Sequence, residues 1–290
     1  MHTLVVNAGG GLCNRINSLV NAIYFSQRLP CKIQLCWQPN NRCDCLFSDL
    51  FSSSLELFDE VTSEKPTLLI KPGAPRPETD STPVLYVPHL EEVSTVASLL
   101  ADTKEDIVQI ANPLLFSGIE PEKAKEIVFG LGIRSRIQKQ ADDFIKENRI
   151  DGSVLGAHVR GTDFGHGKNK PIVNAIRELM RDDETKRCFV CSDELKLERQ
   201  LKRQFPGNII LHDKGKAYVQ RKGLNIFRSW HTDRLWRSGE SIESALVDLL
   251  ILAQTDLACF DPKSTFAQTA LVLGDENAWA RWETSCLARK

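Results

Sequence analysis

An arginine that could bind a phosphate group follows an apolar run in the middle of the chain. Residues 154–164 read VLGAHVRGTDF, where the apolar run predicts a buried strand and Gly161 marks its end. In an open α/β sheet, ligands bind just beyond the carboxyl ends of the strands, so Arg160 is expected where a ligand would bind. A guanidinium is well suited to binding phosphate. The alternative is that Arg160 pairs with Asp163 and that His158 is a satisfied core side chain.

A second anion site is predicted near the N-terminus, where three glycines separate a strand from a helix. Residues 9–15 read GGGLCNR, and the N–H groups at the start of the helix would favour an anion. The run matches neither the dinucleotide-binding glycine pattern nor the Walker-type loop. The alternative is a tight turn that binds no ligand. Two such strand ends in one chain predict two facing domains with a nucleotide between them.

Two further polar segments follow predicted strands. Ser192 and Asp193 come after the apolar residues 188–191 and would either cap the next helix or reach a ribose or a base. Ser264 and Thr265 follow another strand and open a helix, so one of them is the expected N-cap. Their hydroxyls and the backbone N–H groups beside them would also make a phosphate site.

Asp248 is a carboxylate inside an apolar helical run, ALVDLLIL. Burying it is costly unless it is paired. Guanine offers two hydrogen-bond donors on one edge, which one carboxylate can accept. The alternatives are that Asp248 pairs with a protein arginine or lies on a narrow polar face of the helix.

The elements that must position these residues alternate between strand and helix, which predicts an α/β fold. Predicted strands cover residues 4–7, 32–37, 68–70, 85–87, 107–110, 154–159, 188–191, 208–211 and 257–260. Predicted helices follow the first glycine turn and cover residues 121–129, 135–147, 171–180, 194–205, 242–254, 265–273 and 276–287. The linker between the domains is expected near residues 148–153.

Composition excludes several classes of protein. With 290 residues, 42% hydrophobic and 26% charged, the chain is typical of a soluble globular protein with room for two domains. A net charge of -1 argues against a large basic surface, so nucleic acid is not an expected partner. No apolar run approaches the roughly 20 residues of a transmembrane segment, and no signal peptide is evident. We therefore expect a cytoplasmic protein, although a chain whose leader or anchor had been removed would look the same.

The nine cysteines indicate free thiols more than a metal site. Cys188 and Cys191 form a C-x-x-C in a predicted strand, where both side chains cannot point to one face. The cluster within residues 31–45 lacks the paired C-x-x-C spacing of a zinc site. We expect mostly buried thiols and no metal, with a disulfide within residues 31–45 as the alternative.

Four segments, taken in order, resemble the GDP-fucose-dependent fucosyltransferase superfamily, which includes α1,2-, α1,6- and protein O-fucosyltransferases and rhizobial nodulation fucosyltransferases. They are GGGLCNR, HVRGTD, FVCSDE and ALVDLLILAQTDLACFDPKSTFAQTA, and they span residues 9–270. The resemblance implies a GT-B-like α/β fold in which two Rossmann-like domains face a cleft. Residues 1–150 would form the acceptor side and residues 151–290 would bind the nucleotide sugar, with the last helix able to pack back on the first domain.

The resemblance also implies an activity. The chain would be an inverting glycosyltransferase that needs no metal or other cofactor and moves fucose from GDP-fucose to a hydroxyl of a glycan or protein acceptor. The absence of a D-x-D signature fits this, whereas Cys13 and the short chain depart from the family pattern. The alternatives are a GDP-binding relative without activity and another α/β enzyme, such as a sulfotransferase. A location at the periphery of a membrane where acceptors are made also stays open.

The family's functional residues carry over to positions of this chain. Arg160 would hold the β-phosphate as it leaves, His158 would lie beside the nucleotide and Asp248 would recognise guanine. Apart from the resemblance, the reaction calls for a base that takes the acceptor's proton, and Asp163 and His166 are the candidates in the sequence. The remaining predicted donor-site residues are Gly10, Gly11, Asn14 and Arg15 on the N-terminal side, Ser192 and Asp193 after the second strand of the C-terminal half, and Ser264, Thr265 and Phe266 at the phosphate.

Overall fold

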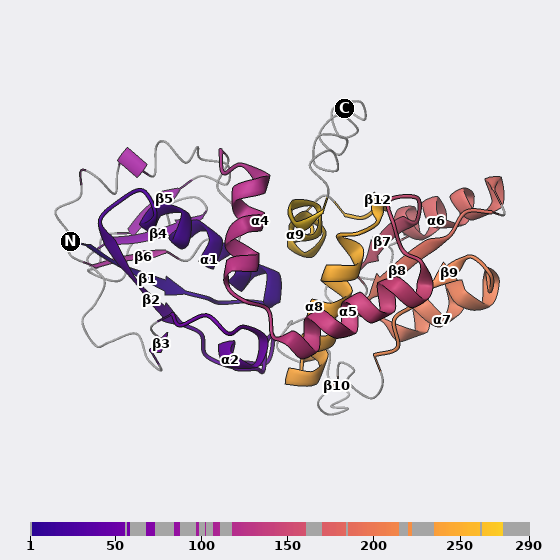
Figure 1. Cartoon of the computed structure of the whole chain (residues 1–290), viewed down its shortest axis with the longest axis horizontal. Helices are drawn as coiled ribbons and strands as arrows, with labels where there is room; N and C mark the ends of the chain where they lie inside the picture. Colours follow the sequence, from indigo (N-terminus) through magenta and orange to yellow (C-terminus); the bar gives the residue numbers. More distant parts are fainter. Residues whose placement is uncertain are drawn as a thin grey trace, which may run out of the picture. The chain divides into compact units, whose positions relative to one another are not determined.

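Each half of the chain folds around a parallel β-sheet in the computed structural model of the protein (Figure 1). The structure describes residues 2–55, 57–58, 68–72, 84–87, 97–98, 102, 107–110, 118–160, 170–183, 185–214, 220–221, 235–261 and 263–274. Two units are distinguished by their internal contacts. The first comprises Met1–Asn40 and Cys45–Ile133, and the second comprises Asn41–Asp44 and Arg134–Lys290.

The first unit begins with strand β1 (His2–Asn7), helix α1 (Leu12–Ser26) and strand β2 (Cys31–Cys36). Its sheet has the order β3-β2-β1-β6-β4-β5, and every pairing is parallel. Helix α1 buries Ile16, Leu19 and Val20, because their spacing places them on one face of the helix. The other elements are α2 (Phe47–Leu50), β3 (Leu57–Phe58), β4 (Leu68–Pro72), β5 (Val84–Val87), β6 (Ile107–Ile110) and α4 (Pro121–Gly130).

The second unit has a parallel sheet of order β12-β7-β8-β9. A separate antiparallel pair joins β10 (Gln220–Arg221) to β11 (Leu235–Trp236). The strands of the parallel sheet are β7 (Leu155–Val159), β8 (Cys188–Ser192), β9 (Ile209–Ile210) and β12 (Asp256–Cys259). The helices are α5 (Ser135–Asn148), α6 (Lys170–Asp182), α7 (Leu195–Gln204), α8 (Gly239–Leu252) and α9 (Thr265–Leu273).

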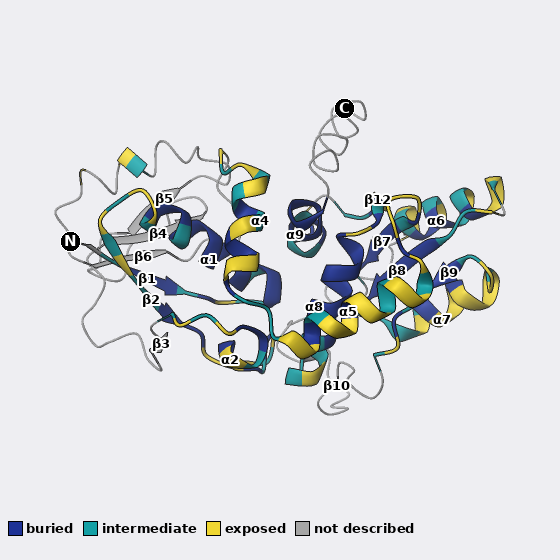
Figure 2. Cartoon of the chain, viewed as in Figure 1, coloured by how far each residue is buried: buried dark blue, intermediate teal, exposed yellow. Residues whose placement is uncertain are grey.

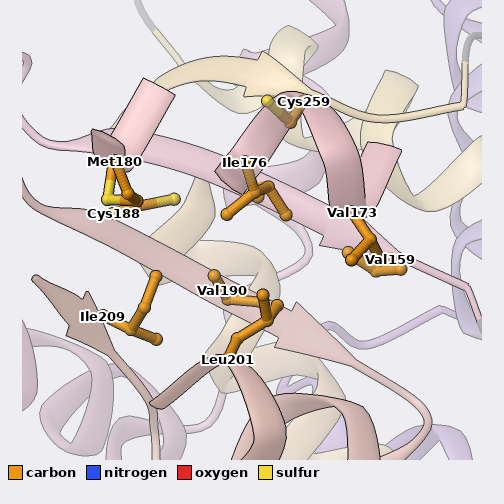
Figure 3. Packing of buried hydrophobic residues seen from close by; sticks show 10 residues of the cluster. Val159, Val173, Ile176, Met180, Cys188, Val190, Leu201, Ile209 and Cys259 are labelled. Atoms are coloured by element: carbon orange, nitrogen blue, oxygen red, sulfur yellow. The ribbon is translucent and has the colours of Figure 1, made fainter. Parts of the chain in front are cut away.

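Helices cover both faces of this second sheet, as parallel sheets require. On one face, α6 and α7 pack on the strands, and Figure 3 shows the aliphatic contacts. The buried residues that form this cluster are Ala157, Val159, Val173, Ile176, Met180, Cys188, Val190, Leu201, Ile209 and Cys259. On the other face, Phe189 contacts Phe144 of α5, with 6.1 Å between the ring centroids. Figure 2 shows the buried sides of α8 and of the strands in this unit.

The predicted order of strands and helices is confirmed within the described residues, with small shifts at the ends. Strand β9 covers Ile209–Ile210, which is shorter than the predicted residues 208–211. The expected helix at residues 276–287, like Asp163 and His166, lies outside the described residues. The predicted α/β class is confirmed.

The units divide at Ile133, whereas the sequence placed the boundary at residue 150. The difference is helix α5, which crosses and packs against α8 in the second unit (Figure 1). An ion pair joins these two helices, since Arg136 Nη2 lies 2.6 Å from Glu243 Oε1. The sequence shows that α5 is amphipathic but not which partner covers its apolar side.

The prediction of mostly buried, free thiols is confirmed for the cysteines that the structure describes. Every cysteine among them is a free thiol, and all except Cys31 are buried. Cys188 faces the cluster formed with α6 and α7, whereas Cys191 lies on the other face of β8, within reach of the charge of Asp248. Within the same described ranges, no helix is both long and apolar enough to cross a bilayer.

Candidate functional site

The polar residues predicted for the second unit gather at the carboxyl ends of adjacent strands. Strand β7 lies between β12 and β8, and all three run parallel. His158 is the penultimate residue of β7 and Arg160 follows the strand, while Ser192 ends β8. Ser264 follows β12 and precedes α9. The structure therefore brings residues from three separate segments to the edge where α/β sheets bind ligands.

His158, Ser264 and Phe266 form a close contact at this edge. Ser264 Oγ lies 3.2 Å from His158 Nδ1. The imidazole stacks on the ring of Phe266, with 4.8 Å between the centroids and 20° between the planes. Ser264 is also the N-cap of α9, because its Oγ accepts a hydrogen bond from the Ala267 N–H, as the sequence predicted. Thr265 is the first residue of that helix.

The environment of His158 keeps its ring neutral at physiological pH. Burial is the main cause that lowers the pKa of His158 from its ordinary value of 6.5 to about 4. The nearby positive charges of Arg160 and Lys214 lower it further, whereas Asp193 and Asp248 oppose the shift. These four charges therefore all lie close enough to act on the imidazole. A neutral ring at this edge donates or accepts a hydrogen bond without adding charge.

We expect this buried ring to make the protein sensitive to mild acid. The unfolded chain binds a proton at His158 near pH 6.5 and the folded chain only near pH 4, so stability falls as the pH drops through that window. Between pH 7.5 and pH 5, the free energy of unfolding of the wild type should fall by about 2 kcal/mol more than that of His158→Gln. Urea unfolding of both proteins at both pH values measures this difference. A stability difference that stays constant with pH would contradict the assignment.

Arg160 lies where the sequence placed it. It is the first residue after β7, is half-buried, and is close enough to influence the pKa of His158. A guanidinium at the end of a central strand can hold a phosphate group that enters from the carboxyl edge. Its predicted companion Asp163 lies outside the described residues.

Ser192 and Asp193 make local polar contacts at the turn that follows β8. Ser192 Oγ accepts a hydrogen bond from the Glu194 N–H at 3.0 Å, one residue before α7 begins. Asp193 Oδ2 lies 3.4 Å from Arg237 Nη2, which makes an ion pair between half-buried side chains. The hydroxyl therefore shapes the turn between β8 and α7, as a capping role would, without bonding to an amide inside the helix.

Asp248 is part of a buried charge cluster that also contains Glu198, His212 and Lys214. Asp248 Oδ1 lies 2.8 Å from His212 Nδ1, and Oδ2 lies 3.0 Å from Lys214 Nζ. The residue is only 3% exposed. Both carboxylate oxygens thus have protein partners. Of the alternatives that the sequence left open, the geometry favours pairing with a protein cation, a lysine rather than the arginine considered there.

Sequence reasoning did not identify the partners of Asp248. One signal was available, because Glu198 lies three residues before the buried Leu201 and so falls on the apolar face of α7. A carboxylate on such a face needs a cation. Lys214 supplies it from the segment that follows β9. Nothing in the sequence between Glu198 and Lys214 indicates that these two residues pair.

The glycine turn of the first unit carries the other predicted group. Gly10 has φ +79°, and a Cβ there would lie 2.7 Å from Asn14 Nδ2, so the position requires glycine. Gly11 is the N-cap of α1 and offers no side chain to cap it. The groups that this helix start can offer to an anion are its amide N–H groups rather than a capping side chain.

Arg15 is buried within the first unit beside the glycine turn. Its side chain is 0% exposed, and it turns inward within the first unit. Nε donates to the Gly10 carbonyl at 3.1 Å, and Nη2 donates to the Gln38 carbonyl at 2.9 Å. The guanidinium also lies over the ring of Trp37, 4.9 Å from its centroid. Arg15 therefore holds the glycine turn in shape, and its contact with a ligand stays a prediction.

The comparisons with known proteins identify the fold. No protein-family model matches the chain, and no match among curated protein sequences reaches significance. The crystal structure of the fucosyltransferase NodZ from Bradyrhizobium is similar over 94% of this chain and 94% of that chain, with 17% identity and a TM-score of 0.61. A variant of Arabidopsis thaliana FUT1 in complex with GDP is similar over 94% of this chain and 68% of that chain, with 13% identity and a TM-score of 0.54.

A third similar structure is POFUT1 in complex with GDP-fucose. It covers 94% of this chain and 93% of its own, with 13% identity and a TM-score of 0.51. At these identities the similarity establishes the fold. The chain shares the α/β fold with parallel sheets that these fucosyltransferases adopt.

Proposed function

We propose that this chain is a glycosyltransferase that moves fucose from GDP-fucose to a hydroxyl of a glycan or protein acceptor. The observation that carries the proposal is the joint position of His158, Arg160 and Ser264 at the carboxyl edge of the second sheet. That edge occurs in a fold shared over 94% of the chain with NodZ, whose structure has also been determined after soaking with GDP-fucose. A fold alone does not define a reaction, so the side chains at this edge support the assignment.

The donor would bind to the second unit through its diphosphate. Arg160 supplies a permanent positive charge, and the N-terminus of α9 supplies backbone N–H groups and the positive end of the helix dipole. Ser264 and Thr265 open that helix, and Phe266 packs on His158. We propose that these groups bind the pyrophosphate and the adjoining ribose.

The reaction would be a single displacement that inverts the anomeric carbon. The acceptor oxygen forms a bond to that carbon while the bond to the β-phosphate oxygen breaks, and GDP leaves with the electron pair. Arg160 and the start of α9 stabilise the charge that develops on the β-phosphate. The acceptor's proton passes to a base, for which Asp163 and His166 are the candidates. We propose that no metal ion is needed, because these fixed groups supply the positive charge.

The first unit would complete the site. In the GT-B arrangement that we propose, the two units face each other across a cleft, and the glycine turn approaches the donor from the acceptor side. Asn14 would provide the side-chain contact there. Arg15 would act from within the first unit, because its hydrogen bond to the Gly10 carbonyl sets the shape of the turn.

A thermal shift screen with GDP, UDP, ADP and their sugars tests the donor class. GDP and GDP-fucose should stabilise the protein, with and without EDTA, because the guanine nucleotide binds without a metal. A ligand at 100 times its Kd adds about 2.7 kcal/mol of stability. A response to adenine nucleotides alone would favour a sulfotransferase-like enzyme. GDP binding with no transfer to any glycan or protein acceptor would indicate a binding protein without activity.

A further inference from the structure

Lys214 is the centre of the buried charge cluster, although the mechanism proposed above gives it no role. It lies four residues after β9, and its side chain is 8% exposed. The ammonium group makes three contacts with groups from three different elements. Nζ lies 2.7 Å from the Ser192 carbonyl oxygen, 2.5 Å from Glu198 Oε1 and 3.0 Å from Asp248 Oδ2.

The first consequence is that the end of β8 is held from both sides. The Ser192 N–H donates to Glu198 Oε1 at 2.7 Å, and the Ser192 carbonyl accepts from Lys214. Glu198 and Lys214 are themselves paired. The backbone of Ser192 is therefore fixed by two charged side chains, and Asp193 follows it directly.

The second consequence is that Asp248 is oriented. The Gln140 amide nitrogen lies 3.1 Å from His212 Nε2, so it donates and His212 Nε2 accepts. His212 Nδ1 therefore carries the hydrogen that is donated to Asp248. With Lys214 on the other carboxylate oxygen, Asp248 is held in one rotamer. Lys214 thus links α7, α8 and the end of β8 in a single arrangement.

Lys214 keeps its positive charge at neutral pH. Burial alone would lower the pKa of Lys214, but Asp248 and Glu198 outweigh it and raise that pKa, so the lysine stays charged. Burial raises the pKa of Glu198, and Lys214 partly offsets this effect. Buried ion pairs add little stability compared with apolar side chains of similar volume, so stability alone does not account for such a cluster. Its members converge on the edge where the donor is proposed to bind.

We propose that Lys214 is a positioning residue of the nucleotide site, which holds the turn at residues 192–193 and the carboxylate of Asp248 in the geometry that donor binding requires. It acts through these groups and does not touch the donor. This inference rests on the proposed function, because it concerns the same edge of the second sheet. Without the ammonium group, the turn and the carboxylate lose their common anchor, and the site samples arrangements that bind the donor weakly.

The test compares wild type with Lys214→Met, which keeps the length of the side chain and removes its charge. Lys196→Met is the matched control, because Lys196 is exposed on the neighbouring helix α7. We expect Lys214→Met to weaken GDP binding by calorimetry about tenfold and to raise the KM for GDP-fucose by a similar factor. This lies at the low end of the range for losing a hydrogen bond to a charged group. The kcat and the KM for the acceptor should change less than about threefold, and Lys196→Met should behave as wild type.

The outcomes separate the inference from the proposed function. If the wild type binds GDP and a folded Lys214→Met binds it equally well, the positioning role is overturned while the function stands. A fall in kcat together with a rise in both KM values would indicate a general structural defect, and it too would overturn the positioning role. If the wild type does not bind GDP, the proposed function fails and the inference with it.

A second variant decides the matter if Lys214→Met does not fold. Glu198→Gln keeps an acceptor for the Ser192 N–H but removes the charge that Lys214 contacts. It should fold and weaken GDP binding at least threefold with kcat retained. Unchanged GDP affinity in folded Glu198→Gln would then overturn the inference.

Discussion

Replacing Arg160 by alanine should lower kcat/KM for GDP-fucose by about 100-fold or more. The guanidinium follows the central strand β7 and is proposed to stabilise the charge that builds on the departing β-phosphate. Removing one donor aimed at such developing charge costs about 100-fold to 1000-fold in other enzymes. The loss should fall mainly on kcat, since the interaction strengthens as the bond breaks.

Two further variants sharpen this result. Arg160→Lys keeps the charge but loses the planar fork of donors, so its activity should lie between wild type and alanine. Arg181→Ala is the matched control, because that arginine is exposed in the last turn of α6. Steady-state kinetics with GDP-fucose measures all three. Turnover close to wild type in Arg160→Ala would refute the role of this residue.

Replacing Asp248 by alanine should destabilise the second unit by about 3–5 kcal/mol. The substitution leaves Lys214 and His212 buried without the carboxylate that accepts from both of them. Breaking a buried pair by removing one partner costs this much; Lys214 keeps Glu198 as a partner, but the lost hydrogen bond from His212 adds to the cost. The melting temperature should fall by about 10 °C, since each kcal/mol corresponds to a few degrees in a protein of this size.

A matched control lies on the same helix. Glu240 is exposed in the first turn of α8, so Glu240→Ala should cost less than about 1 kcal/mol. Asp248→Asn keeps the shape of the side chain and should fall between the two. Thermal unfolding followed by circular dichroism measures the series. A normal melting temperature combined with lost GDP affinity would instead indicate that Asp248 contacts guanine directly.

Much of the architecture follows from local patterns. Apolar runs and helical periodicity predicted the strands of both sheets except β3, and the helices beside them except α2, because burial of one face dictates the spacing of apolar residues. The N-cap at Ser264 was predictable because capping is a local hydrogen bond to an amide three residues on. The positions of His158 and Arg160 at a strand end were predictable because the apolar run that precedes them indicates a buried strand.

The candidate site was predictable only as a set of positions. That His158 stacks on Phe266, more than 100 residues later, depends on β12 lying beside β7 in the sheet. The inward turn of Arg15 depends on the Gln38 carbonyl and the Trp37 ring, which only the packing of the first unit brings beneath it. The boundary at Ile133 depends on the apolar side of α5 being covered by α8.

The amino-acid sequence by itself determined that this is an α/β protein, where its strands end and which polar residues follow them. The tertiary structure alone decided which of those residues meet, and it paired Asp248 with Lys214 and His212. The physical reason is that a strand or a helix is specified by its own hydrogen bonds and apolar spacing. A buried charge is instead specified by whatever opposite charge the order of the strands and the packing of the helices bring within about 3 Å of it.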